Sequence, residues 1–572
     1  MEKADIPKLK YGDLSNGGWG LRIRAKAGHT TPGDEYEVTM RRSFLLFLLL
    51  FTILCVGVQF WTGVYSAGRS LTGDESSHFV NSLLVFDWLR EAPLSNPLRY
   101  AEQYYLHFPR VTIGHWPPLF YAMQAVVFAV AGRSGVAALG FQAIIAGLAC
   151  AWPASLVQNR LGHAAGLATG LFVLASPNLL FLLDAVMVDT LLGVVVLAAA
   201  LCWARFAAAR RLGWAVLFAA VSSAAILLKG NGFSLALLPL LYAAITRDSR
   251  PLLDWRAWFA AAVVAAAVLP WYALTWAMTA DGFNYRLGWD YTSHALPVYA
   301  VAIVQTLGVV GLVGFAACVW RLLREDRVVL DPTLAALVAA ALALFLFQLV
   351  APADTTPRYL VALVPSAALP VVMGLAALVG LVPLRRLAVR AVTALLVLAG
   401  AAAIFVPPHL SPYGMRALAG RVMHAEDPNQ LVLVAGNPRA EGALIAAFDE
   451  QDLRRAHYVL RATQMLASGG FMAQGYATRF PDAAAVRQWL DQSGIGWLVL
   501  EISDEAATYA HNRQVADAAA FSGWQLVERH PASGGEVRLY QLSTKMPTPA
   551  QITALLSRVA PNTPLQLPRG GP

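Results

Sequence analysis

The sequence predicts a polytopic α-helical membrane protein with a small α/β domain near its C-terminus. Hydrophobic residues make up 57% of the 572 residues and charged residues only 14%, whereas soluble proteins carry about 25% charged residues. Apolar runs of bilayer-spanning length recur up to about residue 410, where the composition becomes polar and short apolar strands alternate with helical segments. The net charge is +8, but Lys and Arg form short clusters between the apolar runs. This pattern indicates membrane orientation and no nucleic-acid partner.

Residues 1–42 are expected to form a cytoplasmic tail. They are polar and carry no secretory signal, and Arg41 and Arg42 directly precede the first apolar run, 43–63. We therefore expect this run to be an uncleaved anchor that enters from the cytoplasm. Residues 64–116 then form an external loop, in which the spacing of apolar side chains from His78 to Leu89 predicts an amphipathic helix on the membrane surface.

The number of spans depends on the apolar run 119–131, which is shorter than the roughly 20 residues that a span needs. If this run is not counted, the basic clusters of the later loops all lie in the cytoplasm, as the positive-inside rule requires. This choice predicts about eleven spans in the inner (plasma) membrane and an external, periplasmic C-terminal domain. After the first, the expected spans are 135–157, 164–183, 190–206, 213–229, 232–246, 257–280, 297–321, 332–351, 359–382 and 388–406.

Two adjacent carboxylates, Asp74 and Glu75, follow Gly73 where the chain leaves the first span. Carboxylates at a bilayer edge are costly unless they are paired, solvated or used. One of them could accept the proton of an acceptor hydroxyl, and the alternative is a solvated turn. The predicted topology places further polar residues on the same outer side: His115, Asp184, Asp189, Lys229, His294, Asp354 and Arg358. Each alone is explained by an interfacial charge that reaches water, but together they predict a polar chamber in which an anionic ligand meets a base.

The region after Pro407, Pro408 and Pro412 is predicted to be a separate domain, 411–545, followed by a loosely packed tail, 546–572. The expected strands lie near 431–435, 457–461, 496–500, 524–529 and 537–541, and the expected helices near 440–451, 482–493 and 504–521. The first strand leads through Asn437 into a helix, an arrangement that can bind anions. It has no Gly-rich fingerprint, so an ordinary turn is predicted.

Five short motifs carry a resemblance to a known family, in order and spacing, over about residues 43–410. They are Asp74-Glu75, His115-Trp116-Pro117-Pro118-Leu119, Val188-Asp189-Thr190, Lys229-Gly230 and Arg358-Tyr359. This set resembles the GT-C glycosyltransferases, in the branch that contains the protein O-mannosyltransferases and the aminoarabinose transferase that modifies lipid A. The second motif often begins with Lys in that branch, and this chain has His115 instead.

The resemblance implies a GT-C fold over residues 43–410 and an enzyme that moves a hexose or pentose from a polyprenyl-phosphate donor to an external acceptor. The acceptor is a glycolipid such as lipid A, a glycan or a protein. Asp74 is the implied general base, and Lys229 and Arg358 would neutralise the leaving phosphate. Glu75 or Asp189 would position the acceptor or hold a cation, and His115 would touch the donor phosphate or cap the short helix. His294 is a further candidate for donor binding.

No cofactor is predicted firmly. Some GT-C enzymes use a divalent cation, but this sequence shows no metal-ligand spacing, and its four cysteines lie inside apolar runs. The competing class is a transporter or lipid flippase, and a third possibility is a membrane receptor or scaffold. Transporters usually show internal repeats and charges near the membrane midplane. Here no repeat is found and the charges gather at one face, which favours the glycosyltransferase.

Overall fold

The computed structural model describes most of the chain after residue 31. The described residues are 32–68, 71–325, 330–380, 394, 397–403, 405–427, 429–470, 473–521, 523–532 and 534–560. Residues 1–31 of the expected cytoplasmic tail and nine of the 19 residues of the expected span 388–406 lie outside them.

The N-terminal two thirds of the described chain are helical. Six segments are long and apolar enough to cross a membrane: α1 (Pro32–Thr62, from Arg42), α6 (Gly135–Leu161), α9 (Asp189–Ala209), α13 (Trp255–Asp281), α14 (Trp289–Arg324) and η2 with α16 (Pro357–Leu363 and Val364–Val379). The pair α7 (His163–Leu174) and α8 (Pro177–Leu183), bent by 70°, adds a seventh. The predicted class, a polytopic helical membrane protein, is confirmed.

Four apolar segments are shorter: α5 (Leu119–Ala131), α10 (Leu212–Leu228), η1 with α11 (Gly230–Ala236 and Leu238–Thr246) and α15 (Pro332–Gln348). The run that was left out of the predicted spans is α5, a helix of 13 residues. The total of about eleven spans stays a prediction.

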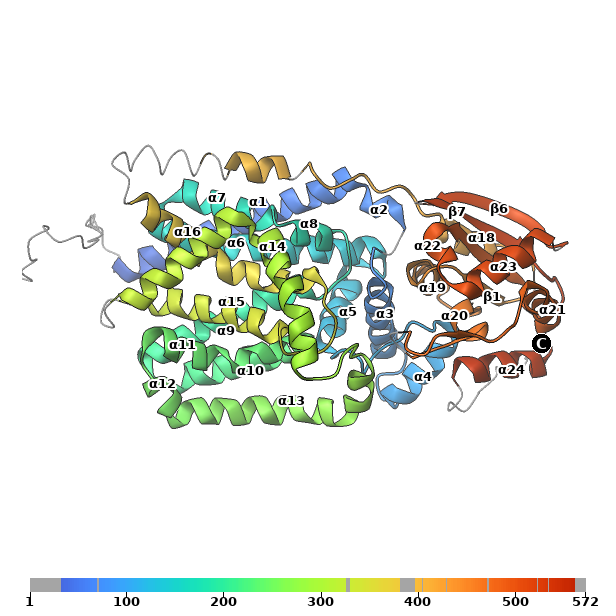
Figure 1. Cartoon of the computed structure of the whole chain (residues 1–572), viewed down its shortest axis with the longest axis horizontal. Coiled ribbons are helices and arrows are strands. Elements are labelled where there is room, and N and C mark those ends of the chain that lie inside the picture. The colour runs from blue at the N-terminus through green and yellow to red at the C-terminus, as the bar shows by residue number, and fades with distance from the viewer. Residues whose placement is uncertain are drawn as a thin grey trace, which may run out of the picture.

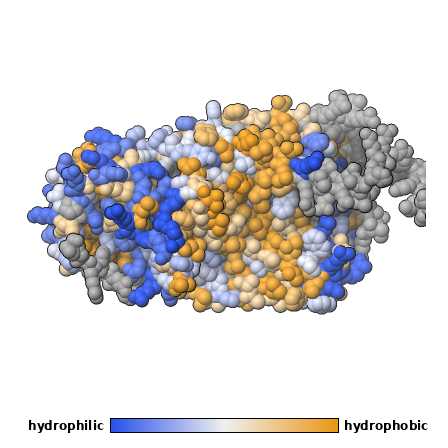
Figure 2. Space-filling view, turned by 180° about the vertical axis from the view of Figure 1, so that it is seen from behind, coloured by the Kyte–Doolittle hydropathy of each residue, from blue (hydrophilic) through white to orange (hydrophobic). Residues whose placement is uncertain are grey.

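The surface of the helical part is divided into zones. Apolar side chains form a band across it, between the polar surface of the C-terminal sheet and a smaller polar patch towards the opposite end (Figure 2). The short helix α12 (Arg250–Leu253) lies at the end away from the sheet (Figure 1). Basic loops meet there, because Arg210 lies 3.9 Å from Asp248 and Arg247 donates to the carbonyl of Glu325 at 3.4 Å.

The segment predicted to be the first external loop, residues 64–116 (called the first external segment below), buries the start of its longest helix inside the protein. It contains α2 (Val64–Ala67), α3 (Glu75–Glu91) and α4 (Pro97–His107). Residues 75–84 of α3 are all buried, between α5 on one side and α19 (Pro438–Gln451) of the C-terminal region on the other. The predicted surface helix is therefore wrong in its location, since tertiary contacts cover its polar face as well as its apolar face.

The C-terminal region is built on a five-stranded sheet. Strand β1 (Leu431–Ala435) lies between β2 (Tyr458–Arg461) and β5 (Trp497–Ser503) and is parallel to both. Antiparallel β7 (Gly535–Gln541) and β6 (Gln525–Ala532) complete the order β2-β1-β5-β7-β6. All five predicted strands are observed. The small hairpin of β3 (Ala467–Ser468) and β4 (Ala477–Thr478) was not predicted.

Helices cover both faces of this sheet (Figure 1). One face packs on α18 (Met415–Met423) and α19 together with Val80, Tyr104 and other residues of α3 and α4. The other face packs on α20 (Ala462–Met465), α21 (Ala483–Ser493), α23 (Ala510–Phe521) and α24 (Pro549–Val559). The short α22 (Asp504–Ala507) follows β5. The prediction of a loosely packed tail from residue 546 is wrong for α24. Thr548 forms a capping box at its start, and Leu555, Leu556 and Val559 are buried.

The turn after β1 is closed by a carboxylate from the neighbouring strand. Asn437 caps α19 by accepting from Arg439 and Ala440. Its backbone N–H donates at 2.8 Å to Glu501, which is 4% exposed. Tyr413 and Ser503 hydroxyls donate to the same carboxylate, each at 3.0 Å.

Candidate functional site

A cavity of about 170 Å³ lies where the ends of the apolar helices meet the first external segment. Four of the predicted site residues line it: Asp74, His115, Lys229 and Arg358. They come from the start of α3, the loop before α5, the end of α10 and the start of η2. The cavity also borders His78, Trp116, Pro117, Gly230, Asn231, Tyr272, Thr279, Gly282, Phe283, Ala353, Asp354 and Tyr359. We call this cavity the chamber.

Asp74 forms an ion pair with Arg358 across the chamber. Its side chain is about one-third exposed and borders the chamber. Burial raises the pKa of Asp74, but the charge and hydrogen bond of Arg358 outweigh it and hold the pKa below its usual value. In this arrangement the Asp74 carboxylate is ionised, and its charge is paired with the guanidinium of Arg358.

Lys229 forms the second charged contact of the chamber. Its ammonium donates to Asp189 at 2.6 Å and lies 4.4 Å from the centre of the Tyr359 ring. The guanidinium of Arg358 is 5.5 Å from the same ring. The cations of Lys229 and Arg358 therefore both lie within cation–π distance of Tyr359. The ion pair between Lys229 and Asp189 is almost completely buried.

His78 is a chamber residue that the sequence analysis did not single out. It lies one turn after Asp74 on α3, with its ring 4.7 Å from that of Trp116 and Nδ1 3.0 Å from the Tyr121 hydroxyl. Asn81 also hydrogen-bonds Tyr121. A Tyr121 hydroxyl that donates to Nδ1 corresponds to the His78 tautomer with its proton on Nε2. Burial lowers the pKa of His78 to about 4, so the ring is neutral. Its spacing of four residues from Asp74 was the signal that could have found it.

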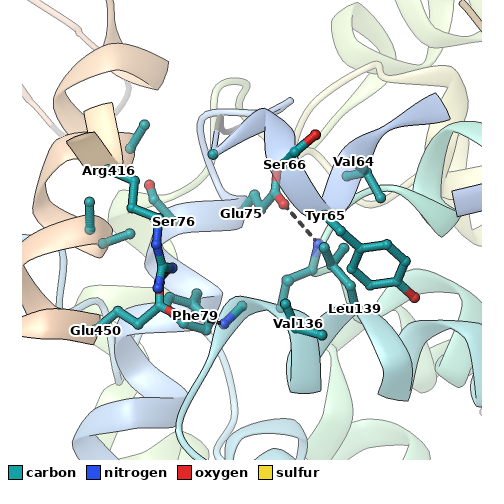
Figure 3. A pocket seen from close by; sticks show the side chains of 16 residues that line it. Val64, Tyr65, Ser66, Glu75, Ser76, Phe79, Val136, Leu139, Arg416 and Glu450 are labelled. Atoms are coloured by element: carbon teal, nitrogen blue, oxygen red, sulfur yellow. Dashed lines mark hydrogen bonds and ion pairs between the residues drawn. The ribbon is translucent and has the colours of Figure 1, made fainter. Parts of the chain in front are cut away.

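Glu75 does not share the chamber with Asp74. It borders a second cavity of about 190 Å³, between α2, α3, α6, α18 and α19 (Figure 3). Its carboxylate accepts from the backbone N–H groups of Leu71 at 2.7 Å and Val186 at 3.1 Å. Burial raises the pKa of Glu75 to about 7 despite these bonds. The expectation that Glu75 lines the chamber is wrong, because adjacent helical side chains point in different directions.

Only one of the two predicted histidines borders the chamber. His115 borders the chamber, and burial lowers its pKa. It does not cap α5, whose first turn follows Pro118. His294 is exposed and shares a hydrogen bond of 3.1 Å with Tyr285, and it is not among the chamber residues. Among the described residues, no group of three His, Cys, Asp or Glu side chains is arranged to hold a metal ion.

Comparison with known proteins supports the resemblance. Residues 115–276 match the family model of dolichyl-phosphate-mannose-protein mannosyltransferases. The fold matches crystal structures of ArnT from Cupriavidus metallidurans, both at 15% sequence identity. The form bound to undecaprenyl phosphate gives a TM-score of 0.54 over 86% of this chain and 98% of that chain. The apo form gives 0.53 over 90% and 99%.

The chain has an ArnT-like fold, which is consistent with the predicted GT-C fold. The family model and the fold together confirm the resemblance to the branch of protein O-mannosyltransferases and ArnT, and they support a membrane glycosyltransferase. No curated protein matches the sequence.

Proposed function

We propose that this GT-C protein transfers a sugar from a polyprenyl-phosphate donor to an acceptor hydroxyl at the external face of the membrane. The observation that carries the proposal is the chamber, where the Asp74 carboxylate pairs with Arg358 and the cations of Arg358 and Lys229 both lie near the Tyr359 ring. Such a set of charges suits a reaction that needs both a proton acceptor and an anionic leaving group.

The donor phosphate would bind to Lys229 and Arg358. Charge-assisted hydrogen bonds to phosphate are about twice as strong as neutral ones. Neutral His78 adds an Nε2–H donor on the same side. Undecaprenyl phosphate is the ligand of one ArnT structure, and the comparable fold here supports a polyprenyl phosphate in this chain.

Arg358 couples donor binding to the activation of Asp74. In the structure its guanidinium neutralises Asp74. When the donor phosphate takes over Arg358, Asp74 loses its partner and its proton affinity rises. Asp74 then accepts the acceptor proton, the acceptor oxygen forms a bond to the anomeric carbon, and the bond from that carbon to the phosphate oxygen breaks. The electron pair leaves with the polyprenyl phosphate, whose charge Lys229 and Arg358 offset.

The remaining acidic residues have supporting roles in this proposal. Asp189 holds the Lys229 ammonium at 2.6 Å. Glu75 fixes the turn before α3 through Leu71 and the segment before α9 through Val186, and it does not touch the acceptor. The acceptor itself is a glycolipid, a glycan or a protein.

The proposed orientation places the N-terminus in the cytoplasm and residues 412–572 outside. The basic loops around Arg210 and Arg247 gather at the end of the helical part away from the sheet, which supports this orientation. Reporter fusions near Arg160 and at the C-terminus test it. A cytoplasmic signal from the C-terminal fusion would reverse the assignment.

The activity is tested with the purified chain in proteoliposomes, labelled undecaprenyl-phosphate sugars and a bacterial membrane extract as acceptor. Wild type should transfer label, and Asp74→Asn should slow transfer about 100- to 10,000-fold while still binding undecaprenyl phosphate. A transporter would instead move the intact donor across the bilayer without transfer. Near-normal transfer by the Asn variant would remove Asp74 from the base role.

A further inference from the structure

A cluster of buried charges lies at the end of α3 far from the chamber. Arg133, in the turn between α5 and α6, donates to Asp87 of α3 at 2.7 Å and to Asp449 of α19 at 3.0 Å. The three side chains are 9%, 3% and 0% exposed, respectively. The cluster therefore joins the first external segment, the helical part and the C-terminal region through one guanidinium.

Neighbouring groups add further hydrogen bonds to this cluster, while Asp87 Oδ1, Arg133 Nε and Asp449 Oδ2 are buried without a hydrogen-bond partner. Arg133 also donates to the backbone carbonyls of Asp449 at 2.6 Å and Glu450 at 3.2 Å. The Tyr104 hydroxyl of α4 contacts both carboxylates, and it lies 3.1 Å from Asp87. Arg455 adds a second cation 3.5 Å from Asp87. These contacts connect α3, α4, the turn between α5 and α6, and the C-terminal region.

Stability alone does not explain so many buried charges. A buried ion cluster loses much of its attraction to desolvation, and apolar residues of equal volume are often as stable or more so. What charged and hydrogen-bonded groups add is geometric specificity, because each must meet its partner in one arrangement. This favours a role in alignment.

The helices that meet at Arg133 both begin at the chamber. Helix α3 starts after Asp74 and reaches Asp87, and α5 starts after the His115–Pro118 loop and ends at Ala131, two residues before Arg133. The 17 residues of α3 span about 25 Å. A tilt of about 3° about one end of such a helix moves the other end by about 1 Å, and a misplacement of that size can cost about 100-fold in rate.

A second contact fixes the chamber end of α3 against the same C-terminal helix. Gly442 of α19 lies so close to Ser76 that a Cβ at position 442 would be 2.1 Å from the Ser76 Oγ. Ser76 is two residues after Asp74 and is 2% exposed. The same helix α19 therefore holds α3 near both ends, with Asp449 at one and Gly442 at the other.

We propose that Arg133, Asp87 and Asp449 are positioning residues through which the C-terminal region sets the place of Asp74 in the chamber. The proposal rests on the proposed function for its kinetic consequence, but its structural part is independent of any activity. Lys229 and Arg358 come from α10 and η2, which the cluster does not hold. Loss of the cluster should therefore impair transfer more than donor binding.

The test uses the full chain in detergent and in proteoliposomes, with Arg133→Met, Arg133→Lys and Gly442→Ala. Amide hydrogen exchange over residues 75–84 should become at least tenfold faster in Arg133→Met and clearly less so in Arg133→Lys, which retains the charge. Binding of undecaprenyl phosphate should stay within about threefold of wild type, while transfer falls at least tenfold. Gly442→Ala should lower transfer in the same way with the cluster intact.

Arg416→Met is the matched control, because Arg416 pairs with Glu450 next to the cluster but is 57% exposed. It should leave exchange and transfer as in wild type. Wild-type exchange in α3 and wild-type transfer by a folded Arg133→Met would overturn the inference, as would equal losses of donor binding and transfer. If wild type transfers no sugar at all, the proposed function fails, and the exchange data still decide the positioning role.

Discussion

Replacing Lys229 with Met separates the structural and the ligand-binding contributions of the buried pair Lys229–Asp189. Methionine keeps the length of the aliphatic stem and removes the ammonium. The Asp189 carboxylate, 1% exposed, then loses its cation at 2.6 Å. Leaving one partner of a buried pair uncompensated costs about 3–5 kcal/mol of stability. If Lys229 also binds the donor phosphate, the variant loses about 1.5–3 kcal/mol of binding free energy, or about 10- to 150-fold in affinity.

The double variant Lys229→Met/Asp189→Asn distinguishes the two contributions. It removes both charges, so most of the lost stability should return, whereas the donor affinity should stay low because the cation is still absent. Thermal unfolding in detergent measures the first quantity, and equilibrium binding of undecaprenyl phosphate measures the second. Asp189→Asn alone is the control, because it retains the ammonium and should bind the donor at least as well as wild type.

The result that refutes this reasoning is recovery of wild-type donor affinity in the double variant. The loss in Lys229→Met would then come from the unpaired Asp189 and not from a missing phosphate contact. Lys229 would be a purely structural residue, and Arg358 would carry the donor charge alone.

Three further outcomes are expected. Glu75→Gln cannot accept both backbone N–H groups that Glu75 now accepts, so thermal unfolding should show a loss of about 1–3 kcal/mol with donor affinity unchanged. Asp449→Asn should flatten the pH dependence of stability: burial raises the pKa of Asp449 to about 7, so the wild type loses stability as pH rises from about 4 to 7 and the amide does not. His78→Phe should weaken undecaprenyl phosphate binding about 2- to 12-fold, equally at pH 6 and 8, because the pKa of His78 is about 4.

Each of these outcomes has a direct contradiction. A Glu75→Gln variant that is as stable as wild type but slow in transfer would mean that Glu75 takes part in the transfer reaction. An unchanged pH profile in Asp449→Asn would assign the titration to Asp87, Glu91 or another group around Arg133 and Arg455. A loss in His78→Phe that appears only at low pH would mean that the imidazolium, not the neutral ring, meets the phosphate.

Local patterns in the sequence predicted most of the secondary structure. The strands of the C-terminal sheet were found because short apolar runs alternate there with turn residues and amphipathic helices. Helix α24 was missed because its Pro- and Thr-rich start resembles a tail, although Thr548 and Gln551 form a capping box. The location of α3 was missed for another reason: the residues that cover it, on α19, are more than 340 positions away in the chain.

The order of the charged motifs predicted which segments meet at the chamber but not how each side chain points. Asp74, Lys229 and Arg358 border the same cavity, as expected for charges at the ends of apolar helices, which must find a partner or water. The different direction of the Glu75 side chain follows from the start of a helix at residue 75, which the motif does not encode. His294 was included for its predicted side of the membrane alone, and the structure bonds it to Tyr285.

The closed turn after β1 has a consequence for what the C-terminal sheet can bind. In parallel sheets a ligand usually occupies the crevice where neighbouring strands lead to helices on opposite sides, and anions favour the helix start there. Here the side chain of Glu501 occupies that position. Its carboxylate accepts hydrogen bonds from the backbone N–H of Asn437 and from the hydroxyls of Tyr413 and Ser503. A tethered group competes at an effective concentration that a dissolved anion of ordinary affinity does not match. In this protein the crevice of the sheet is therefore filled by internal hydrogen bonds. These bonds fix the start of α19, the helix that contacts α3.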